Sequence, residues 1–179
     1  MTNKSPTVPN QIYEIYIKAT PQAIWDAITK PEWTARYGYK GPAQYELRPG
    51  GPYRASASKD MAAMGVTGVL VDGEVIEADP PRKLVQTYRF LFSDVNREEG
   101  FSRVTWEIAA TASGFSLLTV THELQGQPIM AALVAAKFNE SGSGGWTWIL
   151  SDLKSVLETG HAMGELPLPA EHLASLASR

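Results

Sequence analysis

The sequence contains no cysteine and only three histidines. Without cysteine the chain can form neither a disulfide nor a thiolate metal site, and it has no thiol nucleophile. The histidines share no metal-binding spacing, and no HExxH motif is present. We therefore expect a protein without a bound metal or cofactor.

Long apolar runs are also missing. The longest, Ile129–Ala136, is far shorter than the ~20 residues that a membrane-spanning helix needs. Residues 1–10 are polar, contain two prolines and lack the apolar core of a signal peptide. We therefore expect a soluble, cytoplasmic protein that does not enter a membrane.

Positive charge is not in excess, because 16 Lys and Arg residues stand against 19 Asp and Glu, for a net charge of −3. Nucleic-acid binding needs a basic surface, so we expect no nucleic-acid partner. Catalytic motifs are scarce as well. The Gly/Ser segment 141–145 lacks the Lys-Ser/Thr pair of a phosphate loop, and Ser143 lacks the upstream glycine of a nucleophile elbow. The sequence assigns no catalytic residue and leaves open whether the protein is an enzyme.

The pattern of apolar residues predicts an α+β domain. Alternation from Gln11 onward indicates a first strand, and Thr20 is suited to N-cap the helix that follows. Residues 32–39 favour a second short helix. About six consecutive strands come next, and because short turns join them we expect an antiparallel sheet of six to seven strands in all. One face of this sheet must be covered, and we expect a long amphipathic helix ending before Gly160 to be the only element that covers it.

The domain is expected to span residues 11–160. Residues 1–10 have the composition of a flexible lead-in, and residues 161–179 that of a C-terminal tail. Before the last helix, Pro128–Phe138 favours helix by composition. Two interpretations stay open for that segment, a mobile lid and a plain structural helix.

Two tryptophans begin the last helix, two residues apart. Each residue turns a helix by about 100°, so the side chains of Trp146 and Trp148 should point in nearly opposite directions. Trp146 lies in the middle of the apolar face, which should pack on the sheet. Trp148 falls on the opposite side with polar residues such as Asp152. We expect it to be covered by the tail or by Pro128–Phe138, or to form a contact surface.

The apolar face of the predicted sheet combines aromatic residues with two polar ones, Gln86 and His122. Side chains alternate across a strand, so alternate residues of neighbouring strands share this face. Such a set either lines a small-molecule pocket or simply fills the core. His122 is either a general acid or base or a hydrogen-bonded core histidine. The residues expected to bind a ligand are Gln86, Tyr88, Phe90, Val104, Trp106, His122, Trp146 and Leu150.

Five stretches, in order, resemble the heat-shock ATPase activator homologue family of the START/birch-pollen-allergen (SRPBCC) superfamily. They are IYIKATPQAIWDAITKPE, RPGGPY, DGEVIEADPPRKLVQTY, VTWEI and GGWTWILSDLKSVLETG. The resemblance implies a helix-grip fold, in which a curved antiparallel sheet wraps around a long C-terminal helix and leaves a cavity between them. It does not define a reaction, because the superfamily includes carriers, aromatase/cyclases, co-chaperones and self-resistance proteins.

Three functions follow as hypotheses. The first is binding of a hydrophobic, aromatic or polyketide-like small molecule in the cavity, as in sequestration of a toxic metabolite for antibiotic self-resistance. The second is a polyketide aromatase/cyclase-like enzyme with Gln86, Tyr88 or His122 as proton handlers. The third is a co-chaperone-like interaction module, for which Trp148 and the tail would supply the surface. We expect a monomer or a weak dimer.

Overall fold

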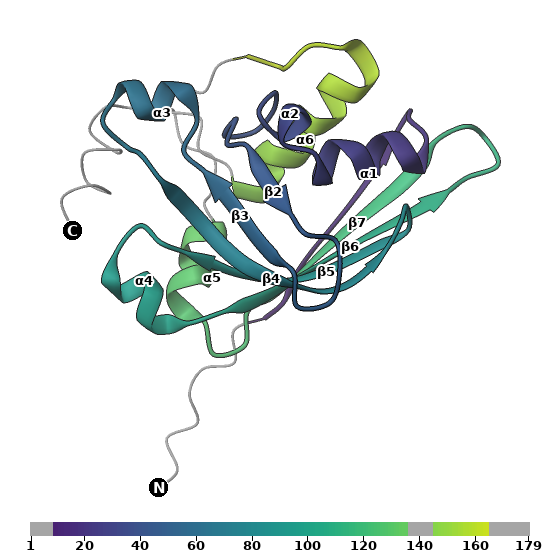
Figure 1. Ribbon diagram of the computed structural model, residues 1–179. Helices are drawn as coiled ribbons and strands as arrows, with labels where there is room; N and C mark the ends of the chain where they lie inside the picture. The colour runs from purple at the N-terminus through teal and green to yellow at the C-terminus, as the bar shows by residue number, and fades with distance from the viewer. Residues whose placement is uncertain (1–8, 136–144, 165–179) are drawn as a thin grey trace, which may run out of the picture.

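Seven antiparallel strands form one curved sheet in the computed structural model, which describes residues 9–135 and 145–164. The strands lie in the order β1-β7-β6-β5-β4-β3-β2, so that only β1 leaves chain order, to pair with β7 (Figure 1). Their bounds are Gln11–Ile17 (β1), Ala43–Tyr45 (β2), Pro52–Ser56 (β3), Val69–Asp79 (β4), Lys83–Phe90 (β5), Ser102–Ala110 (β6) and Ser116–Glu123 (β7). The expected α+β fold with six to seven antiparallel strands is confirmed. Most of the expected lead-in and tail lies outside the described residues.

Six helices occur in the described part of the chain. They are α1 (Pro21–Thr29), α2 (Pro31–Thr34), α3 (Lys59–Ala63), α4 (Asp94–Glu99), α5 (Pro128–Val134) and α6 (Gly145–Thr159). Helices α3 and α4 were not predicted, because they are too short to show a periodicity in the sequence. Each begins at a serine cap: Ser58 Oγ accepts from the Met61 amide at 3.2 Å, and Ser93 Oγ from the Asn96 amide at 3.3 Å.

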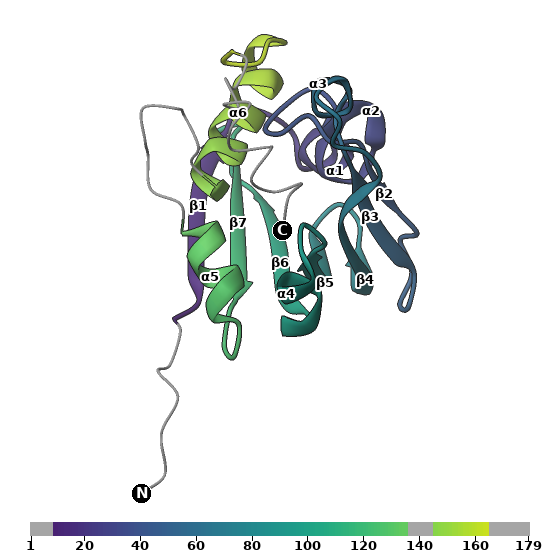
Figure 2. The same cartoon turned by 90° about the vertical axis from the view of Figure 1, so that its left-hand side faces the viewer.

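The core lies between the concave face of the sheet and three helices rather than one. Figures 1 and 2 show α1, α5 and α6 on the same side of the sheet. Their buried residues join the concave-face side chains in one apolar cluster. The expectation that the last helix alone covers the sheet is therefore wrong. The helices contribute Ile24, Trp25, Ala27 and Ile28 from α1, Met130 and Val134 from α5, and Trp146, Leu150, Leu153 and Val156 from α6.

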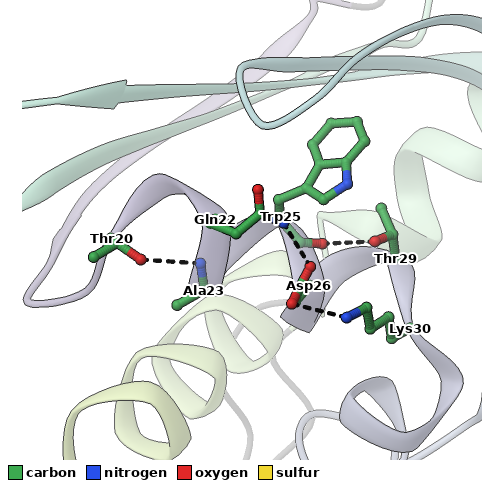
Figure 3. A network of polar contacts seen from close by, with 7 residues as sticks. All are labelled: Thr20, Gln22, Ala23, Trp25, Asp26, Thr29 and Lys30. Atoms are coloured by element: carbon green, nitrogen blue, oxygen red, sulfur yellow. Dashed lines mark hydrogen bonds and ion pairs between the residues drawn. The ribbon is translucent and has the colours of Figure 1, made fainter.

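Helix α1 is defined by local polar contacts at both ends (Figure 3). Thr20 Oγ1 accepts from the Ala23 amide at 3.2 Å, which confirms the predicted cap. On the exposed face Asp26 accepts from Gln22 at 2.8 Å and from Lys30 at 2.9 Å. Pro31 follows Lys30 and begins α2 at once. These contacts orient the apolar face of α1 toward the sheet.

The described part of α5 packs as a structural helix. Met130 and Val134 are buried in the core. At its start both carboxylate oxygens of Glu99 accept backbone N–H groups, from Ile129 at 2.6 Å and from Met130 at 2.8 Å. A carboxylate at a helix N-terminus satisfies otherwise unpaired donors and complements the helix dipole. Residues 136–138 of the segment considered as a lid lie outside the described residues.

Asp152 is fully buried, although the helix pattern placed it on the polar face of α6. Its carboxylate accepts from the Gly38 amide at 2.8 Å and from the Met163 amide at 2.6 Å. Burial of a carboxylate is tolerated when such donors replace water. Asp152 therefore attaches both the loop after α2 and the turn after α6 to the last helix.

Trp148 also contacts the loop after α2. Its indole N–H donates to the Gly38 carbonyl at 3.2 Å, and its side chain is half-buried. The prediction that Trp148 points away from the face occupied by Trp146 is confirmed. The Gly38 loop is a contact that was not expected, and most of the tail and residues 136–138, which were expected to cover Trp148, lie outside the described residues.

Within residues 9–135 and 145–164, none of the helices is both long enough and apolar enough to span a bilayer.

We expect Asp152→Ala to lower the free energy of unfolding by about 2 kcal/mol, because the Gly38 and Met163 amides lose their acceptor. Urea unfolding followed by circular dichroism measures the change. Ser151→Ala is the matched control, since Ser151 is the exposed neighbour on the same helix and its loss should cost less than about 0.5 kcal/mol. Equal stability of the two variants would contradict this role of Asp152.

Candidate ligand-binding site

The eight predicted site residues come together on the concave face. The strand register places Gln86, Val104 and His122 in one row across β5, β6 and β7. Trp106 lies in the next row, and Trp146 and Leu150 approach from α6. Six of the eight are buried, whereas Tyr88 and Phe90 are partly exposed and pack against the core: Gln86 1%, Val104 0%, Trp106 6%, His122 0%, Trp146 4% and Leu150 2% exposed. Their role in binding stays a prediction.

A continuous chain of ring contacts runs across this face, with Tyr88 at its centre. Its ring lies 6.1 Å from that of Tyr53, 6.2 Å from that of Trp146 and 5.5 Å from that of Phe90. Each of these three rings contacts one further ring. Tyr45 stacks on Tyr53 at 4.6 Å, and Phe92 lies 4.7 Å from Phe90. Trp106 lies 5.3 Å from Trp146. Tyr88, Phe90 and Phe92 are partly exposed. The sheet therefore offers an aromatic surface that continues from the surface of the described structure into the core.

His122 has a partner at each ring nitrogen. The indole N–H of Trp146 donates to Nδ1 at 3.1 Å, so Nδ1 is unprotonated. The proton of the neutral ring therefore lies on Nε2, which is 2.7 Å from Ser102 Oγ. Ser102 in turn donates to the Tyr88 carbonyl at 2.9 Å. Donors and acceptors alternate along this chain, and each hydrogen bond supports the next.

Burial lowers the pKa of His122 to about 4, so the ring is neutral near pH 7. Its basic nitrogen Nδ1 is occupied by the Trp146 indole. A general base needs a free lone pair within reach of a substrate proton. The arrangement fits the hydrogen-bonded core histidine better than the catalytic one. Nor does the described part of the chain hold a group of three His, Asp or Glu side chains that could bind a metal ion.

Two buried polar atoms on the concave face have no hydrogen-bond partner among the described residues. They are the amide oxygen Oε1 of Gln86, an acceptor, and the indole Nε1 of Trp106, a donor. Buried polar groups are nearly always paired in folded proteins, and each unpaired one costs about 1–3 kcal/mol. The unpaired atoms therefore indicate where a polar group of a ligand or solvent would be stabilised.

Tyr45 and Tyr53 extend the polar part of the site beyond the predicted residues. Burial raises the pKa of both hydroxyls well above the ordinary value, so both stay protonated at neutral pH. The Gln86 amide acts in the opposite sense and lowers both pKa values. That is the effect of an amide N–H that faces the hydroxyl oxygens.

Three residues on this face were not predicted from the sequence: Tyr45, Tyr53 and Ser102. Ser102 shares the parity of Val104 and Trp106, so extending that alternation by one step would have found it. The two tyrosines lie on β2 and β3, strands too short for their buried face to be assigned from alternation. Only the structure shows that the ring of Tyr53 on β3 reaches that of Tyr88 on β5, two strands away.

A polar groove of about 580 Å³ opens on the other side of the sheet. Thr87, Arg103 and Glu123 form its floor as one row of the convex face. Arg103 Nε and Glu123 Oε2 are 3.8 Å apart there and form an ion pair. The groove contains none of the eight predicted residues, and its lining is polar apart from Phe101.

The arrangement as a whole is a helix-grip fold with an aromatic concave face. The family model described as Activator of Hsp90 ATPase homolog 1-like protein matches residues 18–158. The chain therefore belongs to this family, as the resemblance of its sequence implied. No curated protein matches the chain significantly.

Solved structures share the fold at low sequence identity. CalU16 from Micromonospora echinospora is 19% identical, with a TM-score of 0.58, 95% of this chain and 88% of that chain covered. DynU16, described as a protein in the dynemicin biosynthetic locus, is 20% identical with a TM-score of 0.58, covering 86% of this chain and 48% of that chain. An HSP90 activator from Plasmodium falciparum is 19% identical with a TM-score of 0.51, covering 86% and 90%. These similarities describe the fold.

The buried histidine predicts a pH-dependent stability. An unfolded chain protonates His122 near pH 6.5, but the folded chain does so only near pH 4. Between these values the unfolded state binds more protons, so stability is full above about pH 6.5 and falls as the pH drops toward 4. We expect His122 to lower the free energy of unfolding by about 3 kcal/mol between pH 6.5 and pH 4. Urea unfolding at several pH values measures this change.

His122→Asn removes the titrating ring and should flatten the dependence, whereas His161→Asn, a change at an exposed histidine, should leave it as in the wild type. The same slope in the wild type and in His122→Asn would contradict the buried neutral histidine.

Proposed function

We propose that this protein binds a hydrophobic, aromatic or polyketide-like small molecule between α6 and the concave face, and thereby sequesters a toxic metabolite. The observation that carries the proposal is the aromatic chain centred on Tyr88. A core that only stabilised the fold would gain most from complete burial of its aromatic rings. Here Tyr88, Phe90 and Phe92 keep exposed surface beside buried Trp146.

The chemistry of this surface matches that of small-molecule sites in general. Such sites are mainly apolar and aromatic, with a few polar groups that orient the ligand. The concave face has this composition, with Gln86 and Trp106 as the polar elements that lack partners. The fold is shared with DynU16, a protein of a biosynthetic locus, which supports a natural product as the kind of ligand.

The enzyme hypothesis has less support from the geometry. A cyclase-like mechanism needs a group that takes a proton, and His122 has Nδ1 already bound to Trp146. Burial also raises the pKa of Tyr88, so its hydroxyl stays protonated and is a poor base. If the protein catalyses cyclisation of a polyketide substrate, an unchanged rate of that reaction in His122→Ala would rule out His122 as the base.

The family name favours a second candidate, a co-chaperone-like interaction with Hsp90, and the Plasmodium falciparum activator shares the fold. Trp148, which was expected to belong to that interaction surface, is half-buried against Gly38 and so exposes less area to a partner. Added to purified Hsp90, the protein would raise ATP hydrolysis under this hypothesis. No stimulation and no complex in a pull-down would count against it.

We expect a hydroxylated anthraquinone to quench the tryptophan fluorescence of the protein as it binds beside Trp146. Phe90→Ala should weaken its affinity about tenfold, since an aromatic contact contributes about 1.4 kcal/mol. Phe115→Ala is the matched control, because Phe115 is an exposed phenylalanine immediately before β7 and outside the aromatic chain.

No quenching up to the solubility limit of the anthraquinone would contradict the binding function. Equal affinity of Phe90→Ala and the wild type would remove the site from the concave face.

A further inference from the structure

The unpartnered atoms of Gln86 and Trp106 lie on neighbouring strands and on the same face. Gln86 pairs with Val104 in the register of β5 and β6, and Trp106 follows Val104 two residues later. Diagonal neighbours of this kind have side chains within reach of each other in an antiparallel sheet. One atom is an acceptor and the other a donor. A single small polar group between them could satisfy both.

The orientation of the Gln86 amide supports this arrangement. Its side chain is hydrogen-bonded to the hydroxyls of Tyr45 and Tyr53. Because Oε1 has no hydrogen-bond partner, these contacts come from the N–H side of the amide. Both Gln86 and Trp106 are more than nine-tenths buried, so their unpaired atoms do not lie in bulk water.

The two atoms together select one kind of ligand group. A ligand carbonyl would accept from Trp106 but leave the Gln86 oxygen unpaired, and a C–H or ether group would leave it so as well. A charged group is disfavoured, because the only charged side chain among the fully buried described residues, Asp152, is bound to two backbone amides. A neutral hydroxyl donates to Gln86 and accepts from Trp106 at the same time.

We propose that Gln86 and Trp106 form a hydroxyl-recognition subsite, and that the ligand is an uncharged aromatic compound with a phenolic or enolic hydroxyl group. This inference rests on the proposed binding function and specifies the chemical class of its ligand. The aromatic chain through Tyr88 packs on the ring system, and the subsite orients that ring system by its hydroxyl.

Three small probes of nearly equal shape test the subsite: 2-naphthol, its methyl ether 2-methoxynaphthalene, and naphthalene. We expect the wild-type protein to bind 2-naphthol at least tenfold more tightly than the methyl ether, which keeps the oxygen but lacks the donor. Isothermal titration calorimetry of the full chain at pH 7, where the naphthol is neutral, measures the three affinities.

Variants assign the preference to its atoms. Gln86→Leu should reduce the tenfold preference to less than threefold, because it removes the acceptor. Trp106→Phe should remove any advantage of the methyl ether over naphthalene, because it removes the donor. Gln127→Leu is the matched control, since Gln127 is a buried glutamine near α5 that also has an unpartnered Oε1. It should keep the wild-type preference.

The outcomes separate the two proposals. Binding of all three probes with equal affinity would overturn the hydroxyl subsite, leave the binding function intact, and show that solvent satisfies the two atoms. Binding of none of them would overturn both. The comparison of probes on the wild-type protein decides the matter even if Gln86→Leu fails to fold.

Discussion

The hydrogen bond from the Trp146 indole to Nδ1 of His122 sets the position of the last helix over the sheet. It joins the first turn of α6 to β7 inside the core, where an unpaired donor or acceptor would be costly. Its direction also defines the state of the histidine, because an occupied Nδ1 leaves the proton on Nε2 for Ser102. The Ser102 hydroxyl then holds the Tyr88 carbonyl, so the same chain extends to β5. One chain of hydrogen bonds thus fixes the positions of α6, His122 and Tyr88 relative to one another.

A second polar contact fixes the opposite side of α6. Asp152 binds the Gly38 amide, and Trp148 binds the Gly38 carbonyl, so one loop residue is held twice. The helix is therefore attached inward through Trp146 and outward through Asp152 and Trp148. Because these contacts hold α6 in place, the helix does not need to cover Tyr88 and Phe90 of β5 completely.

Local pattern predicted the concave face well, because strand alternation and helix rotation depend only on backbone geometry. Alternation placed Gln86 and His122 on the same face, although only the strand register put them in one row. A step of about 100° per residue separated Trp146 from Trp148. The same reasoning failed for Asp152, since the donors that make its burial tolerable come from Gly38 and Met163. Contacts between distant segments leave no periodic trace, and the covering of the sheet by α1 and α5 was missed for the same reason.

The two polar sets on the concave face have different consequences for function. The chain through His122 is complete, so it stabilises one arrangement and offers nothing to a substrate. By contrast, Gln86 Oε1 and Trp106 Nε1 lack hydrogen-bond partners, and the cost of burying them is recovered only when another molecule supplies those partners. Aromatic packing alone would accept many flat ligands with similar affinity, because ring faces discriminate weakly. An unpaired donor beside an unpaired acceptor penalises any ligand that lacks a matching group. Under the proposed binding function, selectivity would therefore reside in the atoms that the fold leaves without partners.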